Sequence, residues 1–281
     1  MRIDAHQHFW RLDRGDYGWL TPALGPIHRD FGPDDLAPLL ARAGIDRTIL
    51  VQAAPTEAET RFMLDTALVT PFVAGVVGWT DFEAPDAAQR ITALAAEPLL
   101  VGLRPMVHDL ADPDWLARPE LDPAFDALVE HGLVFDALLK PPHIAAMLRR
   151  LQRTPELTAV IDHAAKPDLA SGDLVYWRDG ISALAAHIGT TCKLSGLVTE
   201  AGPDWTPETL RPAVEHLLKS FGRQRLIFGS DWPVVTLRAG YGTWLETVDA
   251  LLGSLPQGDY AAIMGGTAGR IYLARRGRRP H

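Results

Sequence analysis

The stretch Arg2–Trp10, RIDAHQHFW, places two histidines one residue apart at the end of a short apolar run. Side chains alternate along a β-strand with a period of two, so His6 and His8 would point to one face and Gln7 to the other. Two imidazoles on one face can bind a metal ion or a polar substrate. Two surface histidines near a chain end would give the same pattern, so the rest of the chain has to decide.

Seven more short segments rich in Val, Ile and Leu follow this run. Several are apolar almost throughout, as in Thr48-Ile49-Leu50-Val51, and such runs are typical of strands that are buried on both faces. Together with the opening run they give eight predicted strands, which are Arg2–Phe9, Thr48–Ala53, Phe72–Trp79, Leu99–Val107, Leu133–Leu139, Leu157–His163, Thr191–Leu197 and Arg225–Ser230.

Helical spacing of apolar residues appears between these segments. Gly44 and Gly222 follow two of the patterns as end signals, and Thr206-Pro207 precedes the last of them as a start signal. The patterns are Leu36, Leu39, Leu40 and Ala43; Ile144, Met147, Leu148 and Leu151; and Leu210, Val214, Leu217, Leu218 and Phe221.

Strands that alternate with helices, with no linker between them, predict one α/β domain over residues 1–281, a single (β/α)8 barrel of the TIM type. An open doubly wound sheet is the alternative. That fold normally carries a glycine-rich turn after its first strand, where this chain has His6-Gln7-His8. Residues 13–29 are long for a connection after a strand, and we expect them to form a lid over the barrel mouth.

Composition excludes several classes of partner. A net charge of −8 argues against nucleic acid and gives no basic face for a membrane surface. No apolar run approaches the roughly 20 residues that a membrane span needs. Cys192 is the single cysteine, so no internal disulfide is possible, and the chain starts directly in strand-like sequence. A cytoplasmic protein is therefore expected.

Polar residues stand at the end of every predicted strand. In a barrel of this type the active site lies at the C-terminal ends of the strands and in the loops that follow them. One such residue alone is more often structural than catalytic, but a complete ring points to a site. The ring contains His6, His8, Gln52, Trp79, Asp81, Arg104, Lys140, Asp162, His163, Lys166, Ser195, Asp231 and Trp232.

Longer strings within this ring resemble a known family. They are Asp4-Ala5-His6-Gln7-His8-Phe9-Trp10 with Trp19-Leu20, Val101-Gly102-Leu103-Arg104, Ile161-Asp162-His163 with Lys166-Pro167, and Phe228-Gly229-Ser230-Asp231-Trp232-Pro233. Together they are similar to the amidohydrolase superfamily, and within it to the branch of sugar-acid lactonases that open fucono- and rhamnonolactone. The same branch includes lactonases for pyrone and muconolactone dicarboxylates.

The resemblance implies a lactonase in which Asp231 activates water as a general base. His163, Lys166 and Arg104 are candidates to stabilise the developing negative charge on the carbonyl oxygen. His6, His8 and Asp231 could instead hold one divalent ion, Zn²⁺ or Mn²⁺, as a Lewis acid. Whether activity requires that ion stays open. No organic cofactor is expected.

Substrate contacts are expected from tryptophans that stack on a sugar ring, although packing in the lid or core explains each of them equally well. Trp10, Trp79 and Trp232 are the candidates, with Gln52 and Asp81 to bind hydroxyl groups. The predicted mouth has few free cations for a dicarboxylate, since Arg104, Lys166, Lys140, Arg14 and Arg29 are offset by Asp81 and Asp231. A neutral aldonolactone is therefore favoured.

Other functions stay open at this stage. They are a dicarboxylate lactonase, a metal-dependent decarboxylase on the same barrel, and a binding barrel without activity. The expected partner is a small-molecule lactone. The sequence determines neither its ring size nor the oligomeric state of the protein.

Overall fold

Eight parallel strands form the centre of the molecule in a computed structural model that describes residues 1–274. Each strand pairs with the next one along the chain, in the order β1-β2-β3-β4-β5-β6-β7-β8. The strands are β1 Ile3–Gln7, β2 Arg47–Val51, β3 Val73–Gly78, β4 Leu100–Leu103, β5 Val134–Ala137, β6 Ala159–Ile161, β7 Thr190–Leu194 and β8 Leu226–Phe228.

The sheet closes into a barrel where the end of β1 meets the residues after β8. Asp231 donates its backbone N–H to the carbonyl of His6 at 2.8 Å, and His8 donates to the carbonyl of Trp232 at 2.8 Å. The predicted (β/α)8 barrel is confirmed, and the open-sheet alternative is wrong. Closure also brings the histidines of β1 next to Asp231, although 223 positions separate His8 from that residue.

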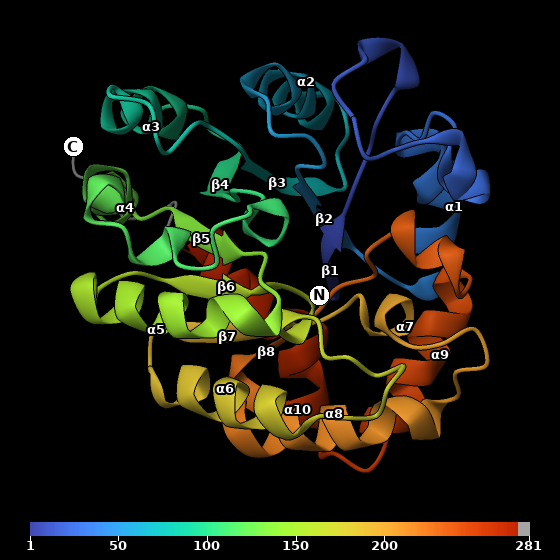
Figure 1. The fold of residues 1–281 in the computed structure, drawn as a ribbon. Coiled ribbons are helices and arrows are strands. Elements are labelled where there is room, and N and C mark those ends of the chain that lie inside the picture. Colours follow the sequence, from blue (N-terminus) through green and yellow to red (C-terminus); the bar gives the residue numbers. More distant parts are fainter. Residues whose placement is uncertain (275–281) are drawn as a thin grey trace.

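Helices surround the strands, as Figure 1 shows. The three helices predicted from apolar spacing are present as α1, α5 and α8, and α1 ends before Gly44, whose φ of 62° is left-handed. The helices are α1 Pro33–Ala43, α2 Glu57–Leu68, α3 Ala87–Ala95, α4 Asp122–His131, α5 Ile144–Arg153, α6 Val175–Ala186, α7 Leu197–Glu200, α8 Pro207–Phe221, α9 Tyr241–Leu252 and α10 Gln257–Ala261. None of the helices in residues 1–274 is long and apolar enough to cross a membrane.

Side chains on the two faces of the strands enter two separate cores. Those that point outward, such as Leu50 and Phe135, pack with the helices in the larger core. Those that point inward fill the barrel with branched aliphatic residues, as expected for this fold. The interior cluster contains Ile3, Ala5, Ile49, Val51, Val77, Val101, Val134, Val160, Ile227, Ala268 and Tyr272.

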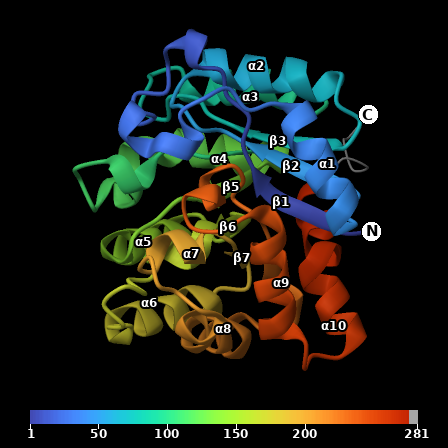
Figure 2. The same ribbon diagram turned by 90° about the vertical axis from the view of Figure 1, so that its right-hand side faces the viewer.

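The C-terminal segment closes the end of the barrel where the strands begin. Tyr272 belongs to the turn Gly269–Leu273 and lies in the interior cluster with Ile3. Gly265 lies so close to the backbone of the first residues that a Cβ on this glycine would lie 2.5 Å from the Met1 carbonyl oxygen. Figure 2 shows the N-terminus beside the C-terminal part of the chain, which is drawn in red and contains α10.

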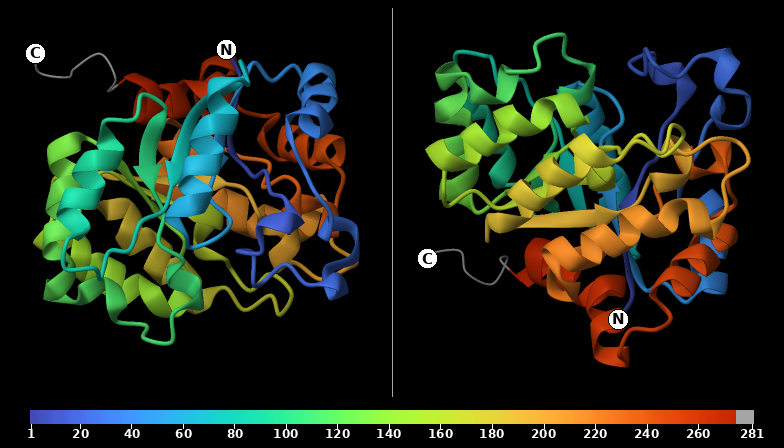
Figure 3. Two further views of the ribbon diagram at one scale, coloured as in Figure 1. Left: turned by 90° about the horizontal axis from the view of Figure 1, so that it is seen from above. Right: turned by 60° about the horizontal axis from the view of Figure 1, so that its bottom comes forward.

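Residues 13–29 lie at the opposite end, where the strands finish. In the left panel of Figure 3 this dark-blue segment lies on the far side of the molecule from the N-terminus. Trp19 anchors it by donating Nε1–H to the carbonyl of Ala53, just after β2, at 2.7 Å. Thr56 donates to Asp16 at 2.8 Å. The segment thus has the position of the predicted lid, and its movement stays a prediction.

Candidate active site

A bulge in β1 directs both histidines into the barrel. Asp4 pairs with Thr48 of β2, but Gln7 pairs with Leu50, so β1 has one residue more than β2 between these pairs. Gln7 then points outward and donates to Thr48 at 3.1 Å. Such a bulge changes the direction of a side chain without breaking the strand. The prediction that His6 and His8 share one face and Gln7 the other is confirmed.

Asp4 holds this bulge in place. Its side chain is fully buried and accepts hydrogen bonds from the backbone N–H groups of His6 at 3.2 Å and Ser230 at 2.8 Å. Tyr241 of α9 donates to its other oxygen at 3.0 Å. Burial raises the pKa of Asp4 to about 6, although these hydrogen bonds oppose the effect. One carboxyl therefore joins the two strand ends that carry the site.

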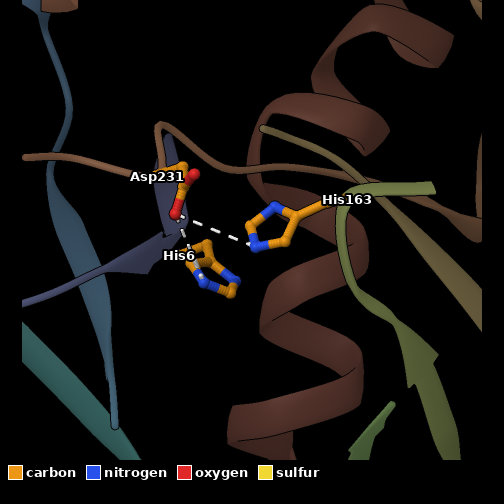
Figure 4. A group of neighbouring side chains, drawn as sticks. All are labelled: His6, His163 and Asp231. Carbon is orange, nitrogen blue, oxygen red and sulfur yellow. Dashed lines mark ion pairs between the residues drawn. The ribbon is translucent and has the colours of Figure 1, made fainter. Parts of the chain in front are cut away.

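Asp231 Oδ1 lies at the centre of three histidines. His8 Nε2 is 3.3 Å away, His6 Nε2 is 3.7 Å away and His163 Nε2 is 3.8 Å away. Figure 4 shows His6 and His163 approaching this oxygen from different directions. All four side chains are at most 6% exposed, so the cluster is almost shielded from water.

His163 reaches the cluster from a strained backbone. The four residues from His163 to Lys166 have φ between 49° and 56°, in the left-handed region, and none of them is glycine. This conformation costs roughly 1–2 kcal/mol per residue and is concentrated at functional sites. Trp177 stabilises the turn by donating Nε1–H to the carbonyl of Ala164 at 2.7 Å.

Ser195 and Gly196 complete the surroundings of His163. The His163 Nδ1 atom lies 2.9 Å from Ser195 Oγ, which orients the ring. A Cβ on Gly196 would lie 2.5 Å from the same nitrogen, and the φ of Gly196 is +65°. The chain therefore needs glycine at this position for two reasons, the left-handed backbone and the space that the imidazole occupies.

The hydrogen bonds of His8 favour a cation next to Asp231. His8 Nδ1 lies 2.8 Å from the carbonyl oxygen of Val51, which can only accept, so Nδ1 carries a hydrogen. In the neutral ring Nε2 is then an acceptor, yet it faces Asp231 Oδ1 at 3.3 Å. Two acceptors at this distance repel, and a cation bound between them would relieve that repulsion.

The donor atoms suit a divalent ion. Within residues 1–274, a group of possible ligands whose atoms lie within 4.8 Å of one another is formed by His6, His163 and Asp231. The predicted ligand set had His8 where this group has His163. Two imidazoles and one carboxylate are ligands that zinc accepts, with a coordination position left open for substrate or water. Their chemistry and spacing therefore fit the expected ion.

Protonation states in the cluster agree with metal binding. Burial lowers the pKa of His6 well below its ordinary value. The charge of Lys193 also lowers this pKa, whereas the charge of Asp162 raises it. Burial also lowers the pKa of His163 far below the usual range, although Asp231 opposes it. Burial alone would raise the pKa of Asp231, but His163, His8 and Lys166 outweigh it and the net shift is downward. His6 and His163 are therefore neutral donors beside an ionised carboxylate.

Arg104 is fixed beneath this cluster rather than free at the mouth. Its Nη1 donates to Asp162 at 3.1 Å and lies 3.2 Å from His6 Nε2. Its Nη2 donates to the carbonyl of Gln52, and Gln52 Nε2 donates back to the carbonyl of Arg104 at 2.6 Å. Both residues are buried, and their predicted roles in catalysis and substrate binding stay predictions.

Two charged residues that the sequence analysis did not select lie under His6. Lys193 on β7 and Asp136 on β5 are fully buried, and their Nζ and Oδ2 atoms are 2.5 Å apart. Lys193 Nζ also lies 3.2 Å from His6 Nδ1. The available signal was a single charged residue in the middle of an otherwise apolar strand, as in Val134-Phe135-Asp136-Ala137.

The other predicted residues have different surroundings. Trp10 is buried, donates Nε1–H to the carbonyl of Arg29 at 2.8 Å and packs edge-on against Phe31. Trp232 packs against the same Phe31, with ring centroids 5.2 Å apart. Trp10 is thus packed against the lid segment and Trp232 against Phe31, and the contact of either indole with substrate stays a prediction.

Trp79, Asp81 and Lys166 are partly exposed. Asp81 accepts from the backbone of Glu83 at 2.9 Å, and Lys166 forms an ion pair with Glu200 of α7 at 2.7 Å. Within residues 1–274, the hydrogen bonds of Trp79 and Asp81 join them to Thr60 and Glu83 rather than to the Asp231 cluster. Lys166 is closer to it, since its charge lowers the pKa values of both Asp231 and His163.

Comparison with known proteins gives the class of this barrel. Residues 3–273 match the family described as Amidohydrolase, so the chain belongs to the amidohydrolase family and the predicted resemblance is confirmed.

Within that family, two relatives share a substrate in their names. The chain is 49% identical over 280 residues to an L-fucono-1,5-lactonase of Burkholderia ambifaria, a match that covers 96% of this chain and 95% of the relative. It is 37% identical to an L-fucono-1,5-lactonase of Burkholderia multivorans, over 97% and 96% of the two chains. A crystal structure of a Burkholderia multivorans amidohydrolase with bound zinc is 36% identical, covers 97% of this chain and 99% of that one, and has a TM-score of 0.92.

Proposed function

We propose that the protein hydrolyses the ester ring of a neutral sugar lactone, with L-fucono-1,5-lactone as the first substrate to test. The observation that carries this proposal is one ionised carboxylate oxygen, Asp231 Oδ1, shared by His6, His8 and His163 in a buried barrel mouth. The protein is a lactonase of the amidohydrolase family, and the names of the two lactonase relatives support this substrate class.

Asp231 acts as the proton shuttle. Its lowered pKa keeps it ionised at neutral pH, so it can accept a proton from water as the water oxygen bonds to the lactone carbonyl carbon. The bond between that carbon and the ring oxygen then breaks. Asp231 returns the proton to the departing alkoxide, which becomes a hydroxyl group. The new carboxylic acid ionises and releases one proton to solution.

A divalent ion held by His6, His163 and Asp231 would polarise the lactone carbonyl, and zinc is our proposal because a similar amidohydrolase structure contains it. The hydrogen bond from His8 Nδ1 to the Val51 carbonyl fixes the ring so that its Nε2 lies 3.3 Å from Asp231 Oδ1. Ser195 orients His163 in the same way. Since both Nη atoms of Arg104 already have partners, we assign this residue to holding His6 rather than to the substrate.

Charge pairing favours a neutral lactone over a dicarboxylate. Each of the cations considered for the mouth has a partner within the chain: Arg104 with Asp162, Lys166 with Glu200, Arg14 with Asp16, Arg29 with Asp35, and Lys140 with the carbonyl of His108. Binding a dicarboxylate would require several free guanidinium or ammonium groups. A neutral polyol requires only hydrogen-bonding groups.

The test follows acid release from L-fucono-1,5-lactone and other aldonolactones with a pH indicator, with the spontaneous hydrolysis rate subtracted. The same assay includes a pyrone or muconolactone dicarboxylate, and carbon dioxide release from aromatic carboxylates is measured in parallel. We expect the highest kcat/KM with a neutral sugar lactone. A dicarboxylate lactone at least tenfold better would overturn the substrate class, and carbon dioxide release without acid formation would indicate a decarboxylase.

Metal dependence is measured on the same preparation. The protein is dialysed against a chelator, its metal content is determined, and activity is assayed before and after Zn²⁺ or Mn²⁺ is added back. We expect activity to fall with zinc content and to return with Zn²⁺. Full activity in metal-free protein would overturn the proposed role of the ion.

A further inference from the structure

A buried group of charges lies inside the barrel, directly below His6. Asp136 of β5, Asp162 at the end of β6 and Lys193 of β7 all have fully buried side chains. Lys193 Nζ is 2.5 Å from Asp136 Oδ2 and 2.9 Å from Asp162 Oδ1. Arg104 Nη1 donates to the other oxygen of Asp162 at 3.1 Å. Two cations are thus matched with two carboxylates.

Stability alone does not explain this group. Removing charges from water is costly, and well-packed aliphatic residues of similar volume often give an equally stable interior. Neighbouring strands of this barrel fill the interior in that way, with Val51 on β2, Val77 on β3 and Val101 on β4. The charged residues of β5, β6 and β7 therefore call for a functional explanation.

Contacts with the His6 ring supply that explanation. Lys193 Nζ lies 3.2 Å from Nδ1, and Asp162 Oδ1 lies 3.4 Å from the same nitrogen. Arg104 Nη1 lies 3.2 Å from Nε2 on the other edge. The imidazole is therefore held at both nitrogens, and its rotation is restricted while Nε2 lies 3.7 Å from Asp231.

Tyr272 connects the group to the far end of the barrel. It belongs to the C-terminal segment that closes the strand starts, and it donates its hydroxyl to Asp136 Oδ1 at 2.8 Å. Its ring is buried, and Lys193 Nζ lies 5.5 Å from the ring centroid. Both oxygens of Asp136 thus have donors, Tyr272 on one side and Lys193 on the other.

We propose that Lys193 is a positioning residue for His6, and that Asp136 and Tyr272 hold Lys193 in place. The C-terminal segment thereby contributes to the geometry of a site at the opposite end of the barrel. This inference rests on the proposed role of His6 in lactone hydrolysis. Metal ligands depend on such supporting contacts, and their loss commonly reduces metal affinity or activity by about 10- to 100-fold.

The mildest test is Tyr272→Phe, which keeps the ring and removes only the hydroxyl. Its matched control is Tyr260→Phe, because Tyr260 donates to Asp249 at 2.5 Å between α10 and α9, outside the barrel. Asp136 and Lys193 lie between Tyr272 and His6, so the effect should be small for a supporting contact. We expect kcat on the sugar lactone to fall about three- to tenfold in Tyr272→Phe, with KM within twofold of that of the unchanged protein. Tyr260→Phe should keep the kcat of the unchanged protein.

Lys193→Met gives the larger effect, because methionine matches the length of lysine without its charge. We expect kcat to fall about 10- to 100-fold and calorimetric Zn²⁺ affinity of the metal-free protein to weaken about tenfold. The double variant Lys193→Met with Asp136→Asn removes one cation and one anion together, so the balance of buried charge is kept. A positioning role predicts that the double variant stays as slow as Lys193→Met.

The outcomes separate this inference from the proposed function. Two results would overturn the positioning role. One is recovery of kcat in the double variant. The other is a kcat and a Zn²⁺ affinity within twofold of those of the unchanged protein in both Tyr272→Phe and Lys193→Met. An unchanged protein that hydrolyses no lactone would overturn the proposed function, and the Zn²⁺ titrations would still decide the inference. If Lys193→Met does not fold, Tyr272→Phe decides it alone.

Discussion

The two halves of the barrel interior differ in chemistry. On one side, β2, β3 and β4 contribute Ile49, Val51, Val77 and Val101, which pack as hydrocarbon. On the other side, β5 and β6 also contribute the aliphatic Val134 and Val160, but charged residues follow toward the site: Asp136 on β5, Asp162 directly after β6 and Lys193 on β7. The same fold and the same strand geometry therefore hold an apolar half and an ionised half. The difference follows the site, because His6, His163 and Asp231 all stand over or beside the ionised half.

Each half has its own requirement. Apolar residues on β2 to β4 stabilise the barrel through burial, and any of comparable volume would serve. Residues of the ionised half are constrained by direction as well as volume, since each must hold a hydrogen bond or an ion pair. Substitutions in the ionised half should therefore change catalysis first, and substitutions in the apolar half should change stability first.

The largest expected effect is that of Asp231→Asn. Asparagine keeps the shape of the side chain and tolerates the left-handed φ of 59° at this position, but it cannot accept the proton from water. General base catalysis is typically worth about 10²- to 10⁴-fold, so we expect kcat to fall by that factor. Circular dichroism and the thermal midpoint should stay close to those of the unchanged protein. Retention of more than about a tenth of the activity would contradict the role of Asp231.

A charge in the apolar half should damage the fold instead. Val77 is fully buried in the interior cluster, whose one hydroxyl, that of Tyr272, already donates to Asp136, so Val77→Asp places a carboxyl where this cluster has no free donor. We expect the free energy of unfolding to fall by about 3–5 kcal/mol, measured by urea denaturation. Val77→Ala is the control for lost volume. Equal losses in the two variants would mean that this half of the interior is hydrated, and the contrast between the halves would disappear.

The apolar half could be predicted from the sequence, but most of the charged contacts of the ionised half could not. Aliphatic runs such as Thr48-Ile49-Leu50-Val51 identify strands directly, and the strand order of a barrel follows from chain order. His6, His163 and Asp231 could be selected because they stand at strand ends. Asp136 and Lys193 stand one or more residues deeper, where a single charge in a strand does not reveal its partner on another strand.

The bulge of β1 was also beyond sequence reasoning. A strict period of two over Ile3–Gln7 would put Ile3 and His6 on opposite faces, yet both enter the interior because β1 gains one residue relative to β2. Only the hydrogen bonds of Asp4 to the backbone of His6 and Ser230 explain how the irregular segment is stabilised. These bonds depend on residues that the chain brings together only when the barrel closes.

Two glycines with nearly the same backbone geometry test the space beside His163. Gly196 has a φ of +65° and a Cβ there would lie 2.5 Å from His163 Nδ1, whereas Gly132 has a φ of +63° with nothing within 4 Å. A displacement of a catalytic group by about 1 Å can lower the rate about 10²-fold. We therefore expect Gly196→Ala, which would displace the His163 ring, to lower kcat by roughly 10- to 100-fold. Gly132→Ala should lose only about 1 kcal/mol of stability and keep its kcat. Equal kcat values in the two variants would show that the His163 ring adapts freely.

The smallest expected effect is a pH dependence of stability from Glu59, a buried carboxyl behind the apolar half. Glu59 of α2 accepts hydrogen bonds from the backbone of Ala53 and Ala54, just after β2, at 2.8–3.0 Å. Burial nevertheless raises its pKa to about 7, above the 4.5 of a free glutamate. The folded state thus binds a proton more tightly than the unfolded state. Its contribution to stability is complete below pH 4.5 and is lost as the pH rises through about 7.

Glu59→Gln isolates this contribution, because glutamine does not titrate while Asp4 and Asp136, whose pKa values burial raises to about 6, titrate in both proteins. We expect the free energy of unfolding of the unchanged protein to fall by about 1–3 kcal/mol relative to that of Glu59→Gln between pH 4.5 and pH 7.5. Urea denaturation at each pH measures the difference. A difference that is constant with pH would mean that Glu59 stays ionised throughout, because the backbone N–H groups of Ala53 and Ala54 then stabilise the carboxylate more than burial destabilises it.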